Sequence, residues 1–159
     1  MKKTDLAPAS NIDFKTASQT LVDLIANIAW VEEGALKQGP FSALTVRDVH
    51  TIYAISMYEE KTASQLAKAV HLSPSAMTTA IDRLVQKGYV ERRRSKTDRR
   101  VVKLGLTHQG RILYRAHRAF HMQLTKAMFT GFSEDAAEVL EKALGNLKNY
   151  LQDLLKEWA

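Results

Sequence analysis

The stretch SPSAMTTAIDRLVQKG, residues 73–88, decides the fold of this chain. Ser73 can cap a helix, Pro74 suits the first helical position because its missing N–H is not needed there, and Gly88 can take the left-handed conformation that ends a helix. Apolar side chains recur along one face at helical spacing, and polar side chains occupy the other face. The inward set is Met77, Ile81, Leu84 and Val85, and the outward set is Ser75, Thr78, Thr79, Asp82 and Gln86. The stretch therefore predicts a short amphipathic helix with a polar outer face.

The flanking residues add a second helix before this one and a β-hairpin after it. Residues 62–65 fit a capping box that opens a short helix, and residues 71–72 leave a tight turn. Downstream, residues 89–93 and 101–106 have the character of two strands joined by a basic loop. The apolar side of the second strand is formed by Val102, Leu104 and Leu106. A helix-turn-helix followed by a basic hairpin predicts a winged helix.

Longer amphipathic helices are predicted on both sides of the winged helix. Residues 14–37 carry an apolar stripe that ends before Gly39-Pro40, and Thr45 and Thr107 are placed to cap two further helices. The expected fold class is mostly α with a small β-hairpin wing, flanked by N- and C-terminal dimerisation helices. The predicted regions are a flexible arm at 1–13, a helical dimerisation region at 14–40 and 108–159, and the winged helix-turn-helix at 41–107.

The last predicted helix, which starts at Ser133, contains a heptad seam. Leucines and one tryptophan recur at alternating spacings of four and three residues. These residues are Leu140, Leu144, Leu147, Leu151, Leu154 and Trp158. Interleaving two copies of the first and last helices would bury more apolar area than packing within one chain, so we expect a homodimer.

Positive charge is concentrated in the middle of the chain. Residues 61–132 hold 15 basic and 3 acidic side chains, whereas residues 1–60 and 133–159 each carry a net charge of −3 within the overall +6. This segregation favours a surface that faces a polyanion, and a basic surface kept for solubility is the alternative. Beside a helix-turn-helix with a basic wing, the expected polyanion is double-stranded DNA.

Composition excludes several other classes of protein. Without cysteine the chain has no disulfides and no thiol redox sensor, and any metal site must use nitrogen and oxygen ligands. No apolar run approaches the roughly 20 residues of a membrane helix, and the polar start lacks a signal-peptide apolar region. We therefore expect a cytoplasmic, nucleoid-associated protein with no membrane partner. Because the chain has no Gly-rich phosphate loop and no nucleophile elbow, we expect no enzymatic activity.

Taken together, these motifs resemble the MarR (multiple antibiotic resistance regulator) family of transcriptional regulators over nearly the whole chain. The segments that carry the resemblance are Leu44-Thr45, Leu66 to Lys87, Gly88 to Arg92, Asp98 to Arg100 and Leu106 to Arg111. The resemblance implies a dimeric repressor on a pseudo-palindromic operator. The polar helix of each copy would lie in the major groove, and the wing would enter the minor groove.

The resemblance also implies which residues meet DNA. Those in or beside the major groove are Ser73, Ser75, Thr78, Thr79 and Arg83. Arg100 matches the family arginine that reaches the minor groove, and Asp98 is placed to orient it, with a simple turn residue as the alternative for Asp98. Phosphate affinity that does not depend on sequence would come from Arg92, Arg93, Arg94, Lys96 and Arg99.

Within the family, the chain is most similar to the branch that represses fatty-acid synthesis genes in Gram-positive bacteria. The similar segments are Val49 to Ile52, Arg99 to Val102 and His117 to His121. That branch is controlled by long-chain acyl groups on acyl carrier protein, and an unrelated small-molecule effector is an alternative. We expect that no cofactor is required. The resemblance implies an apolar effector pocket lined by Ile28, Val31, His50, Ile52, Tyr53, Leu113 and Phe120. Arg111, Arg115 and Arg118 share one helix face and would meet the acidic carrier protein. A contact with DNA phosphates and a simply solvated face are the alternatives.

His117 and His121 lie one helical turn apart, a spacing that can hold one metal ion. With Glu32 and His50 on helices expected nearby, the set resembles the ligands of zinc-sensing members of the family, so a zinc-responsive regulator is the alternative function. Those relatives have a second, cysteine-containing zinc site that is missing here, and a hydrogen-bonded network of the same four residues is another interpretation. The histidine pair also lacks the glutamate of a metalloprotease helix, which argues against a metal-dependent hydrolase.

Overall fold

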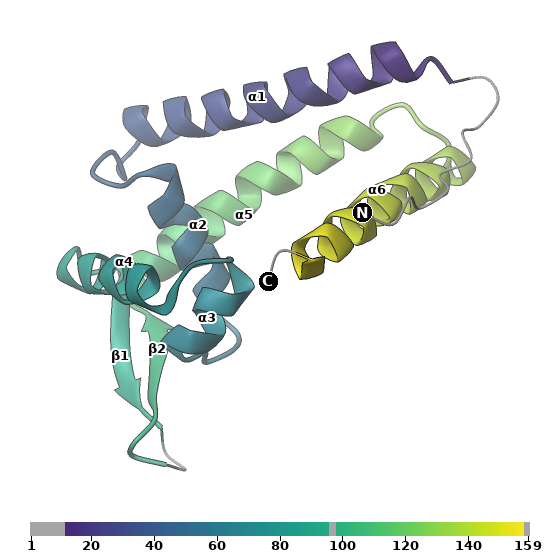
Figure 1. Ribbon diagram of the computed structural model, residues 1–159. Helices are drawn as coiled ribbons and strands as arrows, with labels where there is room; N and C mark the ends of the chain where they lie inside the picture. Colours follow the sequence, from purple (N-terminus) through teal and green to yellow (C-terminus); the bar gives the residue numbers. More distant parts are fainter. Residues whose placement is uncertain (1–11, 96–97, 158–159) are drawn as a thin grey trace. The chain divides into compact units, whose positions relative to one another are not determined.

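The computed structural model describes residues 12–95 and 98–157, which form six helices and one two-stranded sheet (Figure 1). The predicted fold class, mostly α with a β-hairpin wing, is confirmed. The chain divides between Val46 and Arg47 into two compact units. The predicted limits of the arm, the dimerisation region and the winged helix stay predictions, and residues 1–11 of the arm lie outside the described residues.

The first unit contains helix α1, Phe14–Gln38. Its N-terminus is capped by Asp13, whose carboxylate accepts hydrogen bonds from the backbone N–H groups of Lys15 and Thr16. The helix ends at Gly39, whose N–H donates to Leu36. Sequence and structure agree on this helix to within one residue.

The helix-turn-helix lies in the second unit. Helix α2 is Val46–Ile55, α3 is Ala63–Ala69 and α4 is Pro74–Gln86. The capping box at Thr62 and Gln65 is present, and the Ser73 hydroxyl accepts from the Ala76 N–H at 3.2 Å. Gly88, at φ 76°, has the left-handed backbone that ends the segment. The local signals of the deciding stretch therefore act as predicted.

The core of this unit forms where the inward face of α4 meets α2, α3 and the hairpin. Its most deeply buried apolar side chains are Ile52, Ile55, Leu66, Met77, Ile81 and Leu84. Burying an aliphatic side chain of this size stabilises the folded state by about 1.5–3 kcal/mol. This core fixes α4 by one face and leaves its other face outward.

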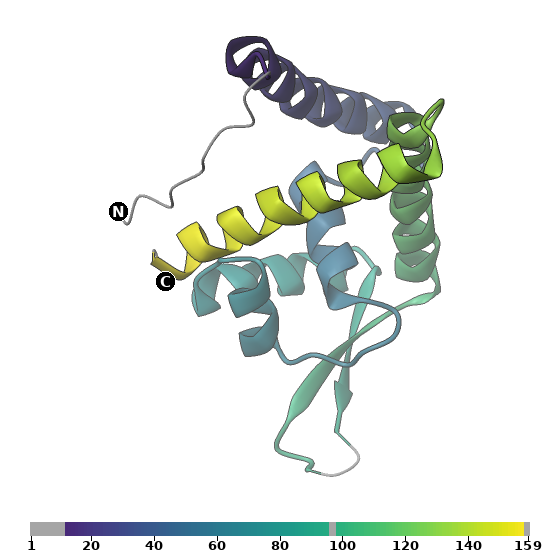
Figure 2. The ribbon, with the colours of Figure 1, turned by 90° about the vertical axis from the view of Figure 1, so that its right-hand side faces the viewer.

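The hairpin consists of β1, Val90–Arg94, and β2, Val102–Leu106, paired antiparallel with Val90 opposite Leu106. It extends away from the helices of its unit (Figure 2). Lys61 adds a single bridge to β2, where its carbonyl accepts from the Leu104 N–H at 2.9 Å. The predicted apolar side of β2 is wrong at Val102, which is 44% exposed, because the tip of the hairpin extends beyond the core.

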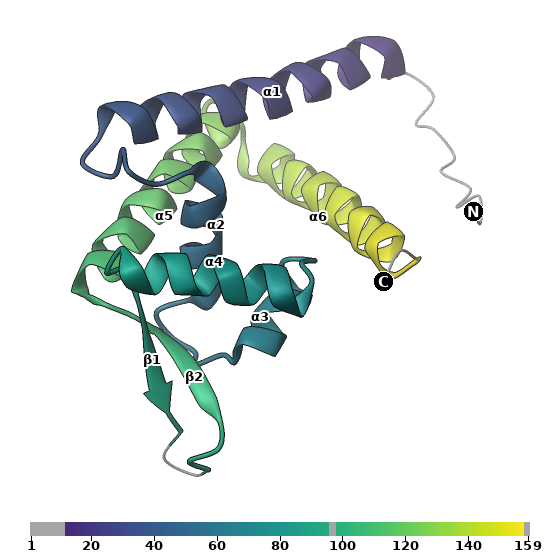
Figure 3. The same ribbon diagram turned by 60° about the vertical axis from the view of Figure 1, so that its left-hand side comes forward.

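Two long helices complete the second unit (Figure 3). Helix α5, His108–Phe129, is capped by Thr107, and α6 is Glu134–Glu157. No residue of α6 in that range is buried, so its leucine seam is uncovered in a single chain. Trp158, the last predicted residue of the seam, lies outside the described residues. In the described part of the chain, no helix has both the length and the apolar character needed to cross a membrane.

Candidate nucleic-acid interface

The outward face of α4 presents a row of hydroxyl groups. Ser73, Ser75, Thr78 and Thr79 are all exposed. The threonine hydroxyls donate to backbone carbonyls one turn earlier, at 2.9 Å for Thr78 and 3.1 Å for Thr79. A hydroxyl in this arrangement still accepts a hydrogen bond and can rotate to donate one elsewhere. The face can therefore meet both donors and acceptors of base edges or phosphates.

Arg83 lies one turn beyond Thr79 on α4 and forms an ion pair inside the unit. Its Nη2 atom is 2.5 Å from Oδ1 of Asp48 on α2, and its Nε donates to the same oxygen at 3.1 Å. The Asp48 side chain is fully buried, whereas that of Arg83 is 45% exposed. Arg83 is thus held on one side and open to solvent on the other.

The wing carries its arginines on exposed positions of the hairpin. Arg92, Arg94, Arg99 and Arg100 are all exposed. Arg92 pairs with Asp82 of α4 at 2.6 Å, which ties β1 to that helix. Guanidinium groups at such positions suit phosphate oxygens, which Arg can bind through two parallel hydrogen bonds. The predicted contact Lys96 lies outside the described residues.

Three acidic residues contact the arginines of the predicted wing. Oδ1 of Asp98 accepts from the backbone N–H of Arg100 at 2.9 Å, so the bond that orients Arg100 acts on its backbone. Arg93 pairs with Glu91 of its own strand and lies 4.0 Å from Glu60. The charge of Arg93 is therefore partly neutralised within the protein.

Three histidines of the second unit gather between α2 and α5. The ring centroids of His50 and His117 are 5.3 Å apart, and those of His117 and His121 are 4.4 Å apart. One nitrogen from each ring lies within 4.8 Å of the others, which is close enough to share a metal ion after small side-chain movements. Glu32, the fourth predicted ligand, belongs to α1 in the first unit.

The predicted effector residues of the second unit divide into two groups. Ile52 and Leu113 are buried in the core, whereas Tyr53 is exposed and Phe120 is half-buried. The Tyr53 ring stacks on Tyr114 with centroids 4.9 Å apart. Ile28 and Val31 belong to α1 in the first unit, so the complete pocket stays a prediction.

The predicted carrier-facing arginines of α5 have different surroundings. Nη1 of Arg111 donates to the Leu106 carbonyl at 2.8 Å, and Nη1 of Arg118 donates to the Tyr58 hydroxyl at 3.1 Å. Arg115 is exposed. Arg111 is half-buried, which leaves Arg115 and Arg118 as the more accessible cations of the three.

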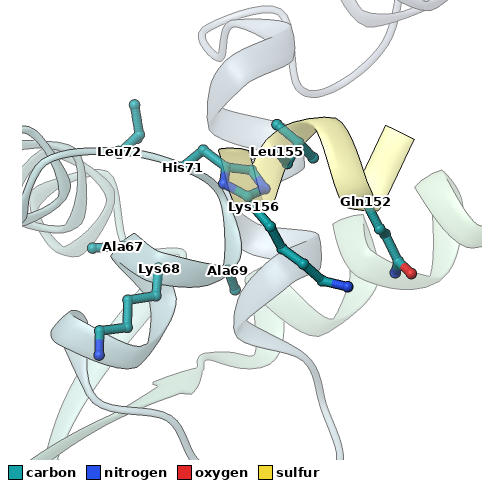
Figure 4. Close-up of a pocket in the computed structure, with 8 residues that line it drawn as sticks. All are labelled: Ala67, Lys68, Ala69, His71, Leu72, Gln152, Leu155 and Lys156. Carbon is teal, nitrogen blue, oxygen red and sulfur yellow. The ribbon is translucent and has the colours of Figure 1, made fainter. Parts of the chain in front are cut away.

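Two hollows of the second unit were not predicted from the sequence. One, of about 960 Å³, lies between the end of α3 and the end of α6, where Lys68, His71 and Lys156 accompany Leu72 and Leu155 (Figure 4). The other, of about 250 Å³, lies beside the hairpin and includes Glu59, Glu60, Arg93 and Arg111. Neither hollow is lined by a residue of the predicted effector pocket.

Comparisons with known proteins agree on one family. A model described as the MarR family matches residues 44–102. The crystal structure of Streptococcus pneumoniae FabT in complex with DNA matches with a TM-score of 0.81 and 35% sequence identity, covering 89% of this chain and 99% of that chain. This chain belongs to the MarR family. The matched residues include α2, α3, α4 and β1, and they end at the first residue of β2.

Two curated relatives match over shorter spans. PecS of Dickeya dadantii (strain 3937), named an HTH-type transcriptional regulator, is 31% identical over 107 residues, which are 67% of this chain and 61% of PecS. YwhA of Bacillus subtilis (strain 168), named an uncharacterized HTH-type transcriptional regulator, is 48% identical over 50 residues, 31% of this chain and 36% of YwhA. The chain therefore spans less than two thirds of either relative.

Sequence reasoning missed the acidic partners in this MarR-family chain. Asp48, buried on α2, and Asp82, exposed on α4, each bind an arginine that was assigned to DNA. For Asp48 a signal did exist, because a carboxylate between apolar residues of an amphipathic helix needs a cationic partner. The identity of that partner follows only from the fold, since it is 35 residues away.

Proposed function

We propose that this MarR-family protein is a sequence-specific, homodimeric DNA-binding transcriptional repressor. The observation that carries the proposal is the exposed hydroxyl face of α4 beside the arginines of the hairpin, in the most basic part of the chain. The similarity to FabT, whose structure was solved in complex with DNA, supports DNA as the partner. Each α4 would read one half-site, and each wing would enter the neighbouring minor groove.

The homodimer follows from the uncovered seam of α6. Leu144, Leu147 and Leu151 are exposed in the single chain, although they recur at heptad spacing. Such a seam is stable in water when a second helix covers it. The expected result of sedimentation equilibrium is twice the chain mass, 35.8 kDa against 17.9 kDa for one chain.

The DNA-binding part is tested with a duplex selected from genomic fragments by the purified protein. Arg100→Ala should weaken binding to this operator and relax the preference for A·T pairs near the wing, by about 1–3 kcal/mol. Arg94→Ala should weaken binding to operator and shuffled duplex alike and should make the salt dependence less steep. Unchanged operator binding by both variants would refute the assignment of the wing.

The effector we propose is a long-chain acyl group carried on acyl carrier protein, with fatty-acid synthesis genes as the target. This proposal rests on the resemblance of the chain to that branch and on the similarity to FabT. Arg115 and Arg118 would meet the acidic carrier. Operator affinity measured with acylated and with unacylated carrier should differ severalfold, and equal affinities would contradict the proposal.

A second candidate function is a zinc-responsive regulator, and the grouping of His50, His117 and His121 favours it. Neutral imidazole nitrogens are suitable zinc ligands. Calorimetry with Zn²⁺ on the metal-free protein should show a site that His117→Ala removes, together with a change in operator affinity. If Zn²⁺ binds but leaves operator affinity unchanged, the site has no regulatory role.

A further inference from the structure

The buried carboxylate of Asp48 faces two cations of α4, one with each of its oxygens. Oδ1 accepts from Arg83 at 2.5 and 3.1 Å, and Oδ2 lies 3.4 Å from Nζ of Lys87. Arg83 and Lys87 are one helical turn apart, so the carboxylate spans a full turn of α4. The contact joins two helices that are distant in the sequence.

The chemistry of the pair makes its geometry restrictive. A carboxylate with no exposed surface is costly unless it is paired and hydrogen-bonded, so Asp48 holds its partners strongly. Asp48 also lies in the first turn of α2, where the helix dipole favours negative charge. A rotation of α4 about its axis, or a slide along it, would separate the carboxylate from at least one of the two cations.

Arg83 has one edge left for another partner. Its Nε and Nη2 atoms bind Asp48, and among residues 12–95 and 98–157 its Nη1 atom has no hydrogen-bond partner. The side chain is 45% exposed and follows Thr79 on the hydroxyl face of the helix. The rigid planar guanidinium can thus bind a carboxylate with one edge and present the other outward.

We propose that Asp48 is a positioning residue for DNA recognition, which holds Arg83 and Lys87 so that α4 presents its hydroxyl face and the Nη1 edge of Arg83 to the operator at one fixed angle. This inference rests on the proposed DNA-binding function. Asp48 itself touches no DNA, because its side chain is fully buried. It acts on specificity through Arg83.

Charge and positioning predict opposite effects for Asp48→Asn. Removing a negative charge from a DNA-binding protein strengthens binding to any duplex through the phosphates. Losing the fixed angle of α4 weakens binding to the operator alone, because base contacts depend on alignment and phosphate contacts depend on it less. The ratio of operator affinity to shuffled-duplex affinity separates the two effects, and a fraction of misfolded protein would leave that ratio unchanged.

The experiment measures this ratio by fluorescence anisotropy for the wild-type full chain, three single variants and one double variant. Asp48→Asn should lower the ratio about tenfold, while affinity for the shuffled duplex stays equal or rises. The matched control is Glu59→Gln, which removes the same charge from a side chain that is 72% exposed and pairs only loosely, at 3.6 Å, with Lys61. The control should keep the ratio of the wild type.

The third variant tests whether Arg83 acts through Asp48. Arg83→Lys keeps the charge and loses the planar fork, so it should lower the ratio by itself. Combined with Asp48→Asn it should lower the ratio no further, because both changes break the same contact. If the double variant lowers the ratio by the product of the two single effects, Arg83 reads DNA independently of Asp48 and the proposal is wrong.

Thermal unfolding accompanies each measurement. If Asp48→Asn does not fold, Lys87→Gln and Lys87→Arg replace it, since Lys87 binds the other carboxylate oxygen and is partly exposed. Lys87→Gln should then lower the ratio of operator affinity to shuffled-duplex affinity, and Lys87→Arg should keep the wild-type ratio. A wild-type ratio in both, or in Asp48→Asn, overturns the positioning role. A wild-type protein that prefers no duplex overturns the proposed function as well.

Discussion

Replacing Gly110 with alanine should destabilise the winged-helix unit, although alanine is the better helix former. Gly110 lies in the first turn of α5, packed against the residues that lead into the hairpin. A Cβ atom there would lie well under 3.0 Å from the carbonyl oxygen of Tyr89, and 3.1 Å from its carbonyl carbon. The same oxygen accepts the Thr107 N–H at 3.1 Å. Since the obstacle is hydrogen-bonded backbone, it cannot rotate away.

Two opposing effects set the magnitude. Alanine gains about 1 kcal/mol of helix propensity over glycine. Overpacking in a well-packed region costs roughly 1–3 kcal/mol, and a clash with fixed backbone belongs at the upper end of that range. The net loss is about 2 kcal/mol, which lowers the melting temperature by roughly 4–8 °C in a chain of this length.

Gly145 provides the matched control. It lies within α6, and a Cβ atom built there meets nothing within 4 Å. Gly145→Ala should therefore raise the free energy of unfolding by up to about 1 kcal/mol. Urea unfolding followed by circular dichroism, at one protein concentration for all samples, measures both changes. If the free energy of unfolding changed in the same direction in Gly110→Ala and Gly145→Ala, the reasoning about the Tyr89 carbonyl would be refuted.

Three further changes test the local structure. Met77→Ala, at a side chain with no exposed surface, should lower the free energy of unfolding by about 2–5 kcal/mol in urea titrations, and a loss below 1 kcal/mol would contradict its central place in the core. Ser73→Ala should cost about 1 kcal/mol by the same method, because the cap of α4 is lost, whereas Ser73→Asp should cost far less. The Thr16 hydroxyl donates to Asp13 and holds the pKa of that exposed carboxyl below its ordinary value of 3.8. A carboxyl whose pKa is lower in the folded state than in the unfolded state stabilises the fold when the pH is above its unfolded-state pKa. Asp13→Asn should therefore lower the melting temperature at pH 7, and its melting temperature should match that of the wild type once the pH falls well below 3.8.

Local signals were sufficient to predict the elements of the fold. Ser73, Pro74 and Gly88 bound α4 because caps, a first-turn proline and a left-handed glycine act through the nearest backbone groups. The strands moved by one residue, which is within the uncertainty of strand ends, and Val102 was assigned to the core face by alternation alone. Alternation predicts which face a residue takes and says nothing of where the core ends.

The sequence predicted the cations of the candidate site and one of its acids, Asp98, but not the two acids that pair with those cations. The assignment of Arg83, Arg92 and Arg100 to DNA came from the family resemblance and stays a prediction, although the structure places all three on exposed positions. Asp48 and Asp82 were missed because an ion pair between distant elements depends on tertiary packing, which no spacing rule encodes. The histidine cluster was predictable from the sequence only in part. One helical turn relates His117 to His121, and only the packing of α2 on α5 adds His50.

The most direct test of the DNA-binding proposal is a titration of a selected operator duplex and its shuffled counterpart at one salt concentration. The account predicts that two chains bind each operator and that the operator binds at least about a thousandfold more tightly than the shuffled duplex at physiological salt. Both affinities should fall steeply as salt increases, because phosphate contacts release counterions. Equal affinity for the two duplexes, or one chain on each operator, would contradict the account.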